Sequence, residues 1–85
     1  METVISLDRL EPGRSARIME IDSESGAARR LREFGLIPGG TIRCRIRSAG
    51  GDPTAYEIRG TVIAIRREDA ARIRVCGNDE AAAWD

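Results

Sequence analysis

Within residues 31–47 the spacing of the apolar residues changes from that of a helix to that of a strand, and this change constrains the fold of the chain most. Leu31 to Phe34 continue a helical pattern, which is expected to stop at Gly35. Glycine is typical just after a helix, because it takes a left-handed backbone conformation without a Cβ clash. Residues 41–47, TIRCRIR, then alternate apolar and arginine side chains, as a half-buried strand does. The sequence therefore predicts a helix, a short connection and a strand.

The connection contains two aliphatic residues, Leu36 and Ile37, followed by the turn Pro38-Gly39-Gly40. In the capping motif expected at Gly35, the apolar residue after the glycine folds back on the last helical turn. Leu36 is therefore expected to pack against Leu31 or Phe34. Two readings of Ile37 stay open. It either plugs one end of a small barrel or stands exposed on a rigid turn as a docking point.

The other elements are short, and most are strands. Strands are predicted at 14–21, 41–47, 55–59, 61–65 and 73–75, helical turns at 6–10 and 66–72, and a helix at 27–34. About five short strands with one or two short helices favour a mostly β fold, a small closed barrel. The chain is predicted to form one domain, residues 1–76, with a flexible tail at 77–85. The predicted core comprises Leu31, Phe34, Ile42, Cys44, Ile46, Ile63, Ile65, Ile73 and Val75.

The composition argues against several classes of function. Fourteen basic and fourteen acidic residues give zero net charge, which disfavours non-specific binding to nucleic acid or to anionic membranes. Histidine is absent and no nucleophile has an obvious base partner, so no catalytic residue is assigned and no enzyme is expected. No apolar run approaches the ~20 residues that span a bilayer, and no signal-peptide pattern opens the chain. A cytoplasmic protein without membrane insertion is expected.

Potential metal ligands are present, but no recognisable metal site. The two cysteines stand outside any CxxC pattern and are expected to be reduced core thiols, with a disulfide only if the fold brings them together. No spacing of carboxylates matches a known site, so no metal ligands are assigned and no cofactor is expected to be required. Surface carboxylates are expected to bind divalent metal only adventitiously. The ligand candidates considered are Asp22, Glu24, Asp52, Asp69 and Asp79, with the thiols of Cys44 and Cys76.

The order of these motifs resembles the ferrous iron transport protein A (FeoA) family over about residues 5–76. The resemblance rests on RL-x-x-x-G-L-x-P-G, from Arg30 to Gly39, and on A-I-R-x-x-D-A-x-x-I-x-V, from Ala64 to Val75. It implies an SH3-like barrel with a helix between its first two strands. It also implies a small cytoplasmic accessory protein that acts by protein–protein contact on the FeoB-type ferrous iron transporter. Iron-dependent repressors end in the same domain, so a nucleic-acid-binding or repressor-associated module is the alternative.

A small neutral barrel without a cleft acts through its surface, where a few apolar or arginine anchors dominate affinity. A rigid turn loses little entropy on binding, which favours the connection after the predicted helix. The arginines at alternate positions of 43–47 are instead expected to be a solvated strand face, because no aromatic stacking platform accompanies them. The chain is expected to be a monomer or a weak dimer. The predicted partner-binding residues are Leu36, Ile37 and Pro38, with Arg29, Arg30 and Arg32 of the helix, and the structural turn residues are Gly35 and Gly39.

Overall fold

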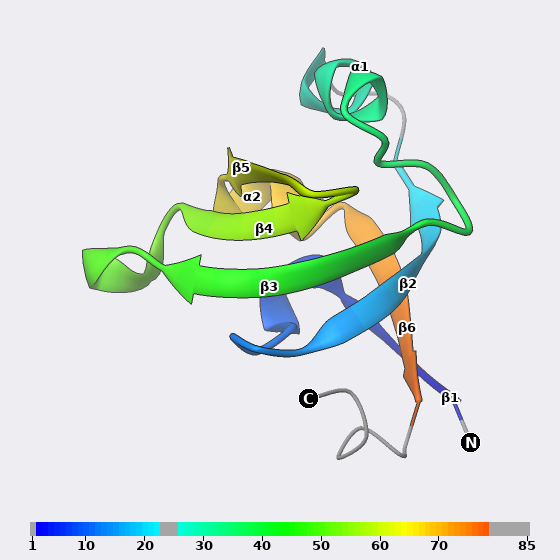
Figure 1. Cartoon of the computed structure of the whole chain (residues 1–85), viewed down its shortest axis with the longest axis horizontal. Coiled ribbons are helices and arrows are strands. Elements are labelled where there is room, and N and C mark those ends of the chain that lie inside the picture. Colours follow the sequence, from blue (N-terminus) through cyan, green and yellow to red (C-terminus); the bar gives the residue numbers. More distant parts are fainter. Residues whose placement is uncertain (1, 23–25, 79–85) are drawn as a thin grey trace.

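A computed structural model describes residues 2–22 and 26–78 of the chain (Figure 1). Strands dominate it, and the helices are short. In chain order the elements are β1 (Glu2–Ser6), the 3-10 helix η1 (Leu7–Arg9), β2 (Ser15–Ile21), α1 (Gly26–Glu33), β3 (Thr41–Arg47), the 3-10 turn η2 (Ala49–Gly51), β4 (Thr54–Ile58), β5 (Thr61–Ile65), α2 (Arg67–Ala70) and β6 (Ile73–Asn78). The predicted mostly β fold with two short helices is confirmed.

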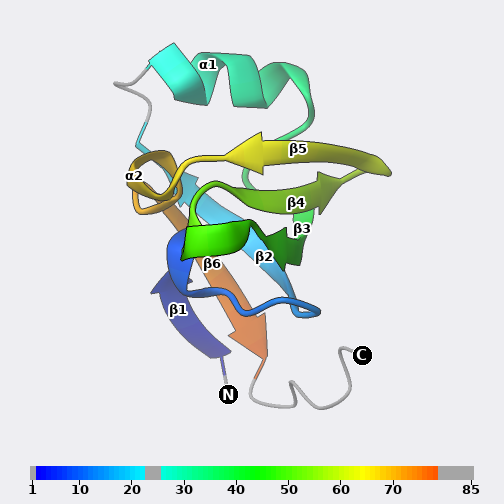
Figure 2. The ribbon, with the colours of Figure 1, turned by 90° about the vertical axis from the view of Figure 1, so that its left-hand side faces the viewer.

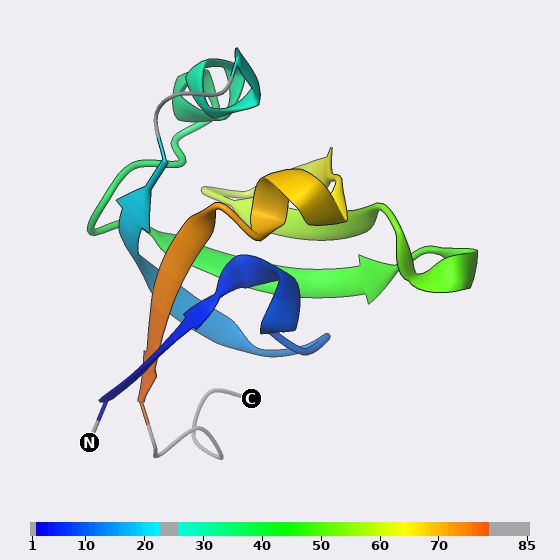
Figure 3. The same ribbon diagram turned by 180° about the vertical axis from the view of Figure 1, so that it is seen from behind.

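The six strands found within the described ranges form one antiparallel sheet in the order β1-β6-β2-β3-β4-β5. The sheet curls around a single core, and η1 and α2 lie against each other on one side of it (Figure 3). β1 and β5 end the strand order and are not paired with each other, so the expected closed barrel is open at this point.

Strand β1 was not predicted. It pairs antiparallel with β6, with Val4 opposite Cys76, and β6 itself runs on to Asn78. Thr3 and Val4 are both exposed, so the short segment lacks the alternation that reveals a half-buried strand. Of the predicted tail, Gly77 and Asn78 belong to β6, and residues 79–85 lie outside the described residues.

The core fills the inside of the curled sheet. Among the predicted core residues, Ile42, Cys44, Ile65, Ile73 and Val75 are buried, and Leu31 and Ile63 are partly buried against them. The predictions for Phe34 and Ile46 were wrong, because these side chains are 49% and 65% exposed. Core residues that were not on the predicted list include Leu7, Leu10, Ala16, Ile18, Leu36, Tyr56, Ile58 and Ala70.

Ile46 faces solvent because β3 contains a bulge. Cys44 pairs with Tyr56 of β4, whereas Ile46 pairs with the preceding residue, Ala55, so Arg45 is an extra residue in β3. An extra residue reverses the alternation of the side chains that follow it. Ile46 therefore points outward, and Arg47 lies opposite the buried Thr54. The prediction that Arg43, Arg45 and Arg47 share one face fails at Arg47.

The end of α1 has the predicted capping geometry. Gly35 has φ +101°. Its N–H donates to the Arg32 carbonyl at 3.0 Å, and the Leu36 N–H donates to the Leu31 carbonyl at 3.1 Å. These two bonds close a helix at a left-handed glycine and turn the next apolar residue inward. Leu36 is fully buried as a result, whereas Phe34 stays on the outer side.

Replacing Gly35 by valine is expected to lower the free energy of unfolding by more than about 1 kcal/mol, because a β-branched residue resists a positive φ. A Cβ there would also lie 3.0 Å from Arg59 Cδ and 3.4 Å from Ile58 Cγ2. Chemical denaturation followed by circular dichroism measures the change. Gly39→Val is the control for backbone strain alone, because Gly39 has φ +91° but its Cβ would meet nothing within 4 Å, so it should lose less stability than Gly35→Val. A Gly35→Val protein as stable as the parent would contradict the capping assignment.

Candidate docking surface

An exposed apolar pair flanks the turn after α1. Phe34 is 49% and Ile37 40% exposed, and Pro38 beside them is also exposed. The three arginines of α1, which precede Phe34 by two to five residues, are also exposed. We call this set the α1-loop surface: Phe34, Ile37 and Pro38, with Arg29, Arg30 and Arg32.

Backbone hydrogen bonds hold the loop in place against β2. The Gly39 N–H donates to the Ile18 carbonyl at 2.7 Å, and the Ile18 N–H donates to the Gly40 carbonyl at 2.8 Å. Within the loop, the Gly40 N–H donates to the Ile37 carbonyl at 3.0 Å. Gly39 has the positive φ of a turn residue, as predicted. A partner that contacts Ile37 therefore meets a loop that is already ordered, which reduces the entropy lost on binding.

The helix beside the loop is locally basic. Three arginines against the single carboxylate of Glu33 give α1 a formal charge of +2, although the whole chain is neutral. Figure 2 shows α1 above β5, at one end of the molecule. Arginines next to an exposed aromatic and an aliphatic side chain form the combination in which binding energy concentrates at protein interfaces.

The structure changes the predicted membership of this surface at two residues. Leu36 was predicted both to pack against the last turn of α1 and to bind a partner, and its complete burial agrees with the first prediction and not with the second. Phe34 was predicted to lie in the core, but its side chain is half-exposed. It stands three residues before Ile37, which is also exposed. The capping motif contained the signal for this exchange, because the residue after the glycine takes the inward position. Ile37 is too exposed to be a buried plug of the barrel.

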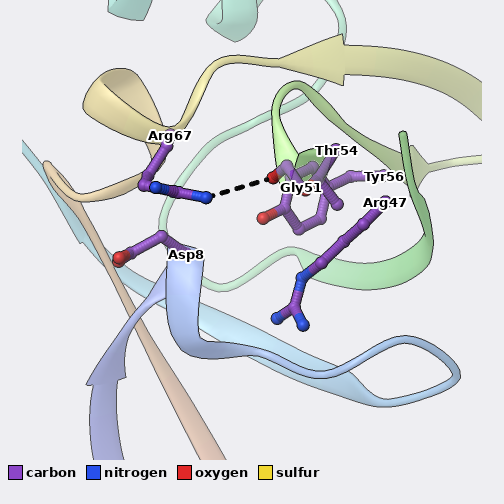
Figure 4. Close-up of a pocket in the computed structure, with 6 residues that line it drawn as sticks. All are labelled: Asp8, Arg47, Gly51, Thr54, Tyr56 and Arg67. Atoms are coloured by element: carbon purple, nitrogen blue, oxygen red, sulfur yellow. Dashed lines mark hydrogen bonds between the residues drawn. The ribbon is translucent and has the colours of Figure 1, made fainter. Parts of the chain in front are cut away.

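A hollow of about 350 Å³ lies between η1, the β3–β4 connection and α2 (Figure 4). Arg47 Nη2 donates to the Leu10 carbonyl at 3.1 Å, and Arg67 Nη2 donates to the Gly51 carbonyl at 3.5 Å. The sequence did not reveal this site, because the bulge in β3 is what brings Arg47 to it. The lining residues are Asp8, Arg47, Gly51, Thr54, Tyr56 and Arg67.

The potential metal ligands do not converge within the described ranges. No group of three or more Cys, Asp or Glu residues that could hold a metal gathers in residues 2–22 and 26–78. Asp52 Oδ1 accepts the Arg67 N–H at 2.9 Å, and Asp22 pairs with Arg72 at 3.7 Å. Glu24 and Asp79 lie outside the described residues.

The two cysteines are buried thiols and form no disulfide. Burial raises the pKa of the Cys44 thiol, which disfavours the thiolate that binds metals. None of the helices in the described ranges combines the length and the apolar character needed to cross a bilayer.

The curled six-stranded sheet and its short helices define a small, open β-barrel domain, with the exposed α1-loop surface at one end. A model of the FeoA domain matches residues 5–76, so the chain belongs to the FeoA domain family, which is linked to ferrous iron uptake. This confirms the resemblance found in the sequence. No functionally curated protein matches the chain.

Solved structures agree with this assignment. The FeoA protein of Chlorobium tepidum is 28% identical with a TM-score of 0.78, over 84% of this chain and 68% of that one. FeoA of Stenotrophomonas maltophilia is 27% identical with a TM-score of 0.72, over 91% of this chain and 93% of that one. That protein is described as complexed with zinc and as an SH3 domain protein. The SH3-like fold is thereby confirmed.

The fold also occurs within a longer protein. IdeR of T. acidophilum is 27% identical with a TM-score of 0.75, over 89% of this chain but only 35% of IdeR. The structural similarity is therefore shared by FeoA proteins and by one part of this larger protein.

Tyr56 provides a test of the core. It is the single tyrosine of the chain, and its OH donates to the Leu7 carbonyl at 3.3 Å. Burial, followed by the nearby Cys44, raises the pKa of Tyr56 to about 12. An unfolded tyrosine has a pKa near 10, so between pH 10 and 12 only the unfolded chain loses this proton. The free energy of unfolding should fall across that window by about 1.4 kcal/mol per pH unit from this group.

Ultraviolet absorbance of the phenolate measures the titration of Tyr56 directly. In the Tyr56→Phe protein, the part of the decrease in unfolding free energy between pH 10 and 12 that comes from Tyr56 should disappear. Half-formation of the phenolate near pH 10, with the protein still folded by circular dichroism, would contradict the buried position.

Proposed function

We propose that this protein is a cytoplasmic accessory of ferrous iron uptake that binds the FeoB-type transporter through the α1-loop surface. The observation that carries the proposal is the exposure of Phe34 and Ile37 on a hydrogen-bonded turn beside three arginines. Family membership supports the link to ferrous iron, and the S. maltophilia relative is described as possibly acting as a ferrous iron transport activating factor.

Leaving the apolar side chains of Phe34 and Ile37 in water costs free energy. A domain of this size has few apolar side chains to bury, yet it places a phenylalanine and an isoleucine on its surface. The free energy falls when a partner covers these two side chains and removes them from water. Exposed apolar patches rimmed by charge are typical of protein-binding sites. Because α1 carries a formal charge of +2, the proposal favours a partner surface with carboxylates around an apolar centre.

A repressor-associated or nucleic-acid-binding module is the competing function. It would use a basic stripe on β3, but the bulge divides the arginines between two faces. Arg45 forms an ion pair with Glu57 at 3.1 Å, which reduces the positive charge of the outer face. The neutral chain adds no long-range attraction to phosphates. These features favour contact with a protein.

The substitution Ile37→Asp is expected to leave the fold intact and to weaken binding to the cytoplasmic part of the transporter by at least about tenfold, because it places a charge in an apolar contact. Phe34→Asp should act in the same direction. Binding is measured by calorimetry with the purified cytoplasmic domain, and uptake by ferrous iron accumulation in cells. Circular dichroism must first show that each variant is folded.

Val4→Asp is the matched control, since Val4 is 55% exposed but lies on β1, outside the α1-loop surface. It should bind and support uptake as the parent does. Folded Ile37→Asp and Phe34→Asp proteins with parental affinity and uptake would remove this surface from the proposal.

We further propose that the protein needs no resident metal or other cofactor and performs no catalysis. Anaerobic calorimetric titration with ferrous iron should then show no binding of micromolar or tighter affinity at unit stoichiometry. Tight stoichiometric binding would contradict this part of the proposal without affecting the docking surface.

A further inference from the structure

The hollow beside η1 contains two arginines that lack a carboxylate partner among the described residues. Within residues 2–22 and 26–78, ion pairs join Arg45 to Glu57 and Arg72 to Asp22. The guanidinium groups of Arg47 and Arg67 instead donate to backbone carbonyls, at 3.1 and 3.5 Å. A guanidinium has five N–H donors, so each group keeps further donors for a ligand.

The inward position of Arg47 depends on the β3 bulge. Without the extra residue at Arg45, Ile46 would point inward and Arg47 outward. The bulge instead leaves Ile46 65% exposed and brings the arginine over Tyr56 and Thr54. Bulges occur frequently next to functional sites, where they redirect a side chain. Here the bulge exposes an isoleucine and places a charged side chain at a hollow, as expected of a bulge beside a binding site.

The residues that line the hollow carry a formal charge of +1, from Arg47 and Arg67 against Asp8. The carboxylate of Asp52 beside it accepts the main-chain N–H of Arg67 at 2.9 Å and leaves the guanidinium group without an ion pair. Figure 4 shows the carboxylate of Asp8 turned away from Arg47 and Tyr56. Asp8 Oδ1 is itself buried without a hydrogen-bond partner, so it does not neutralise either guanidinium through a direct bond. Thr54 and Tyr56 contribute hydroxyl groups to the wall. The Tyr56 hydroxyl already donates to the Leu7 carbonyl, so the donors that remain for a ligand belong mainly to the two guanidinium groups.

We propose that this hollow binds a small oxyanion, the phosphate or carboxylate group of a small molecule, between Arg47 and Arg67. Guanidinium groups bind both kinds of oxyanion with paired, charge-assisted hydrogen bonds. The volume of about 350 Å³ lies within the usual range of ligand pockets and is larger than a single ordered water requires. The site shares no residue with the α1-loop surface, so the two proposals stand or fall separately.

The test is a titration of the whole ¹⁵N-labelled chain, followed by NMR, with inorganic phosphate, acetate and citrate in separate arms at constant ionic strength. Chloride serves as the non-oxyanion reference. The proposal expects saturable shifts of the Gly51, Thr54 and Arg67 amide signals, with a dissociation constant on the order of 1 mM. Saturation by phosphate alone would identify a phosphoryl ligand, and saturation by acetate or citrate a carboxylate.

The substitutions Arg47→Gln and Arg67→Gln should each raise the dissociation constant for the oxyanion by at least about tenfold. Arg45→Gln is the matched control, because Arg45 lies two residues away on the same strand but pairs with Glu57 on the outer face. It should respond as the parent does. The proposal is overturned if no arm saturates below about 50 mM, or if folded Arg47→Gln and Arg67→Gln proteins both respond like the parent.

Discussion

The reversal of the chain at Gly35 is the constraint on which the rest of the molecule depends. A left-handed residue at this point lets the Leu36 N–H reach the Leu31 carbonyl and turns the Leu36 side chain into the core. The same geometry leaves the side chains of Phe34 and Ile37, on either side of Gly35 and Leu36 in the sequence, exposed to solvent. One local backbone requirement thus fixes the end of α1, completes the core and creates the apolar part of the α1-loop surface.

Patterns that depend on neighbours in the sequence were predicted well. The positive φ of Gly35, the burial of Leu36 and the burial of Ile42 and Cys44 all follow from local rules of capping and alternation. Two features set by strand pairing, the β3 bulge and strand β1, were missed. The β3 bulge becomes visible only when Ile46 is seen opposite Ala55, and β1 is stabilised by its partner β6 rather than by a pattern of its own. The hollow was missed for the same reason, since three separate elements assemble it.

The two candidate sites differ in their chemistry and in how they arise. The α1-loop surface combines apolar side chains with a basic helix, and it suits a broad protein contact. The hollow is small and lined by polar groups, and it suits a compact charged ligand. A neutral chain can support both because its charges are distributed unevenly, with a formal charge of +2 on α1 and +1 on the residues that line the hollow.

The central claim is that this FeoA domain acts through residues 29–38. The most direct measurement is NMR mapping of the ¹⁵N-labelled chain in the presence of the unlabelled cytoplasmic domain of an FeoB-type transporter. The account predicts that the largest losses or shifts of amide signal fall between Arg29 and Pro38, while those of β1 around Val4 stay unchanged. Strong changes confined to other elements, with the signals of α1 and its loop unaffected, would contradict it.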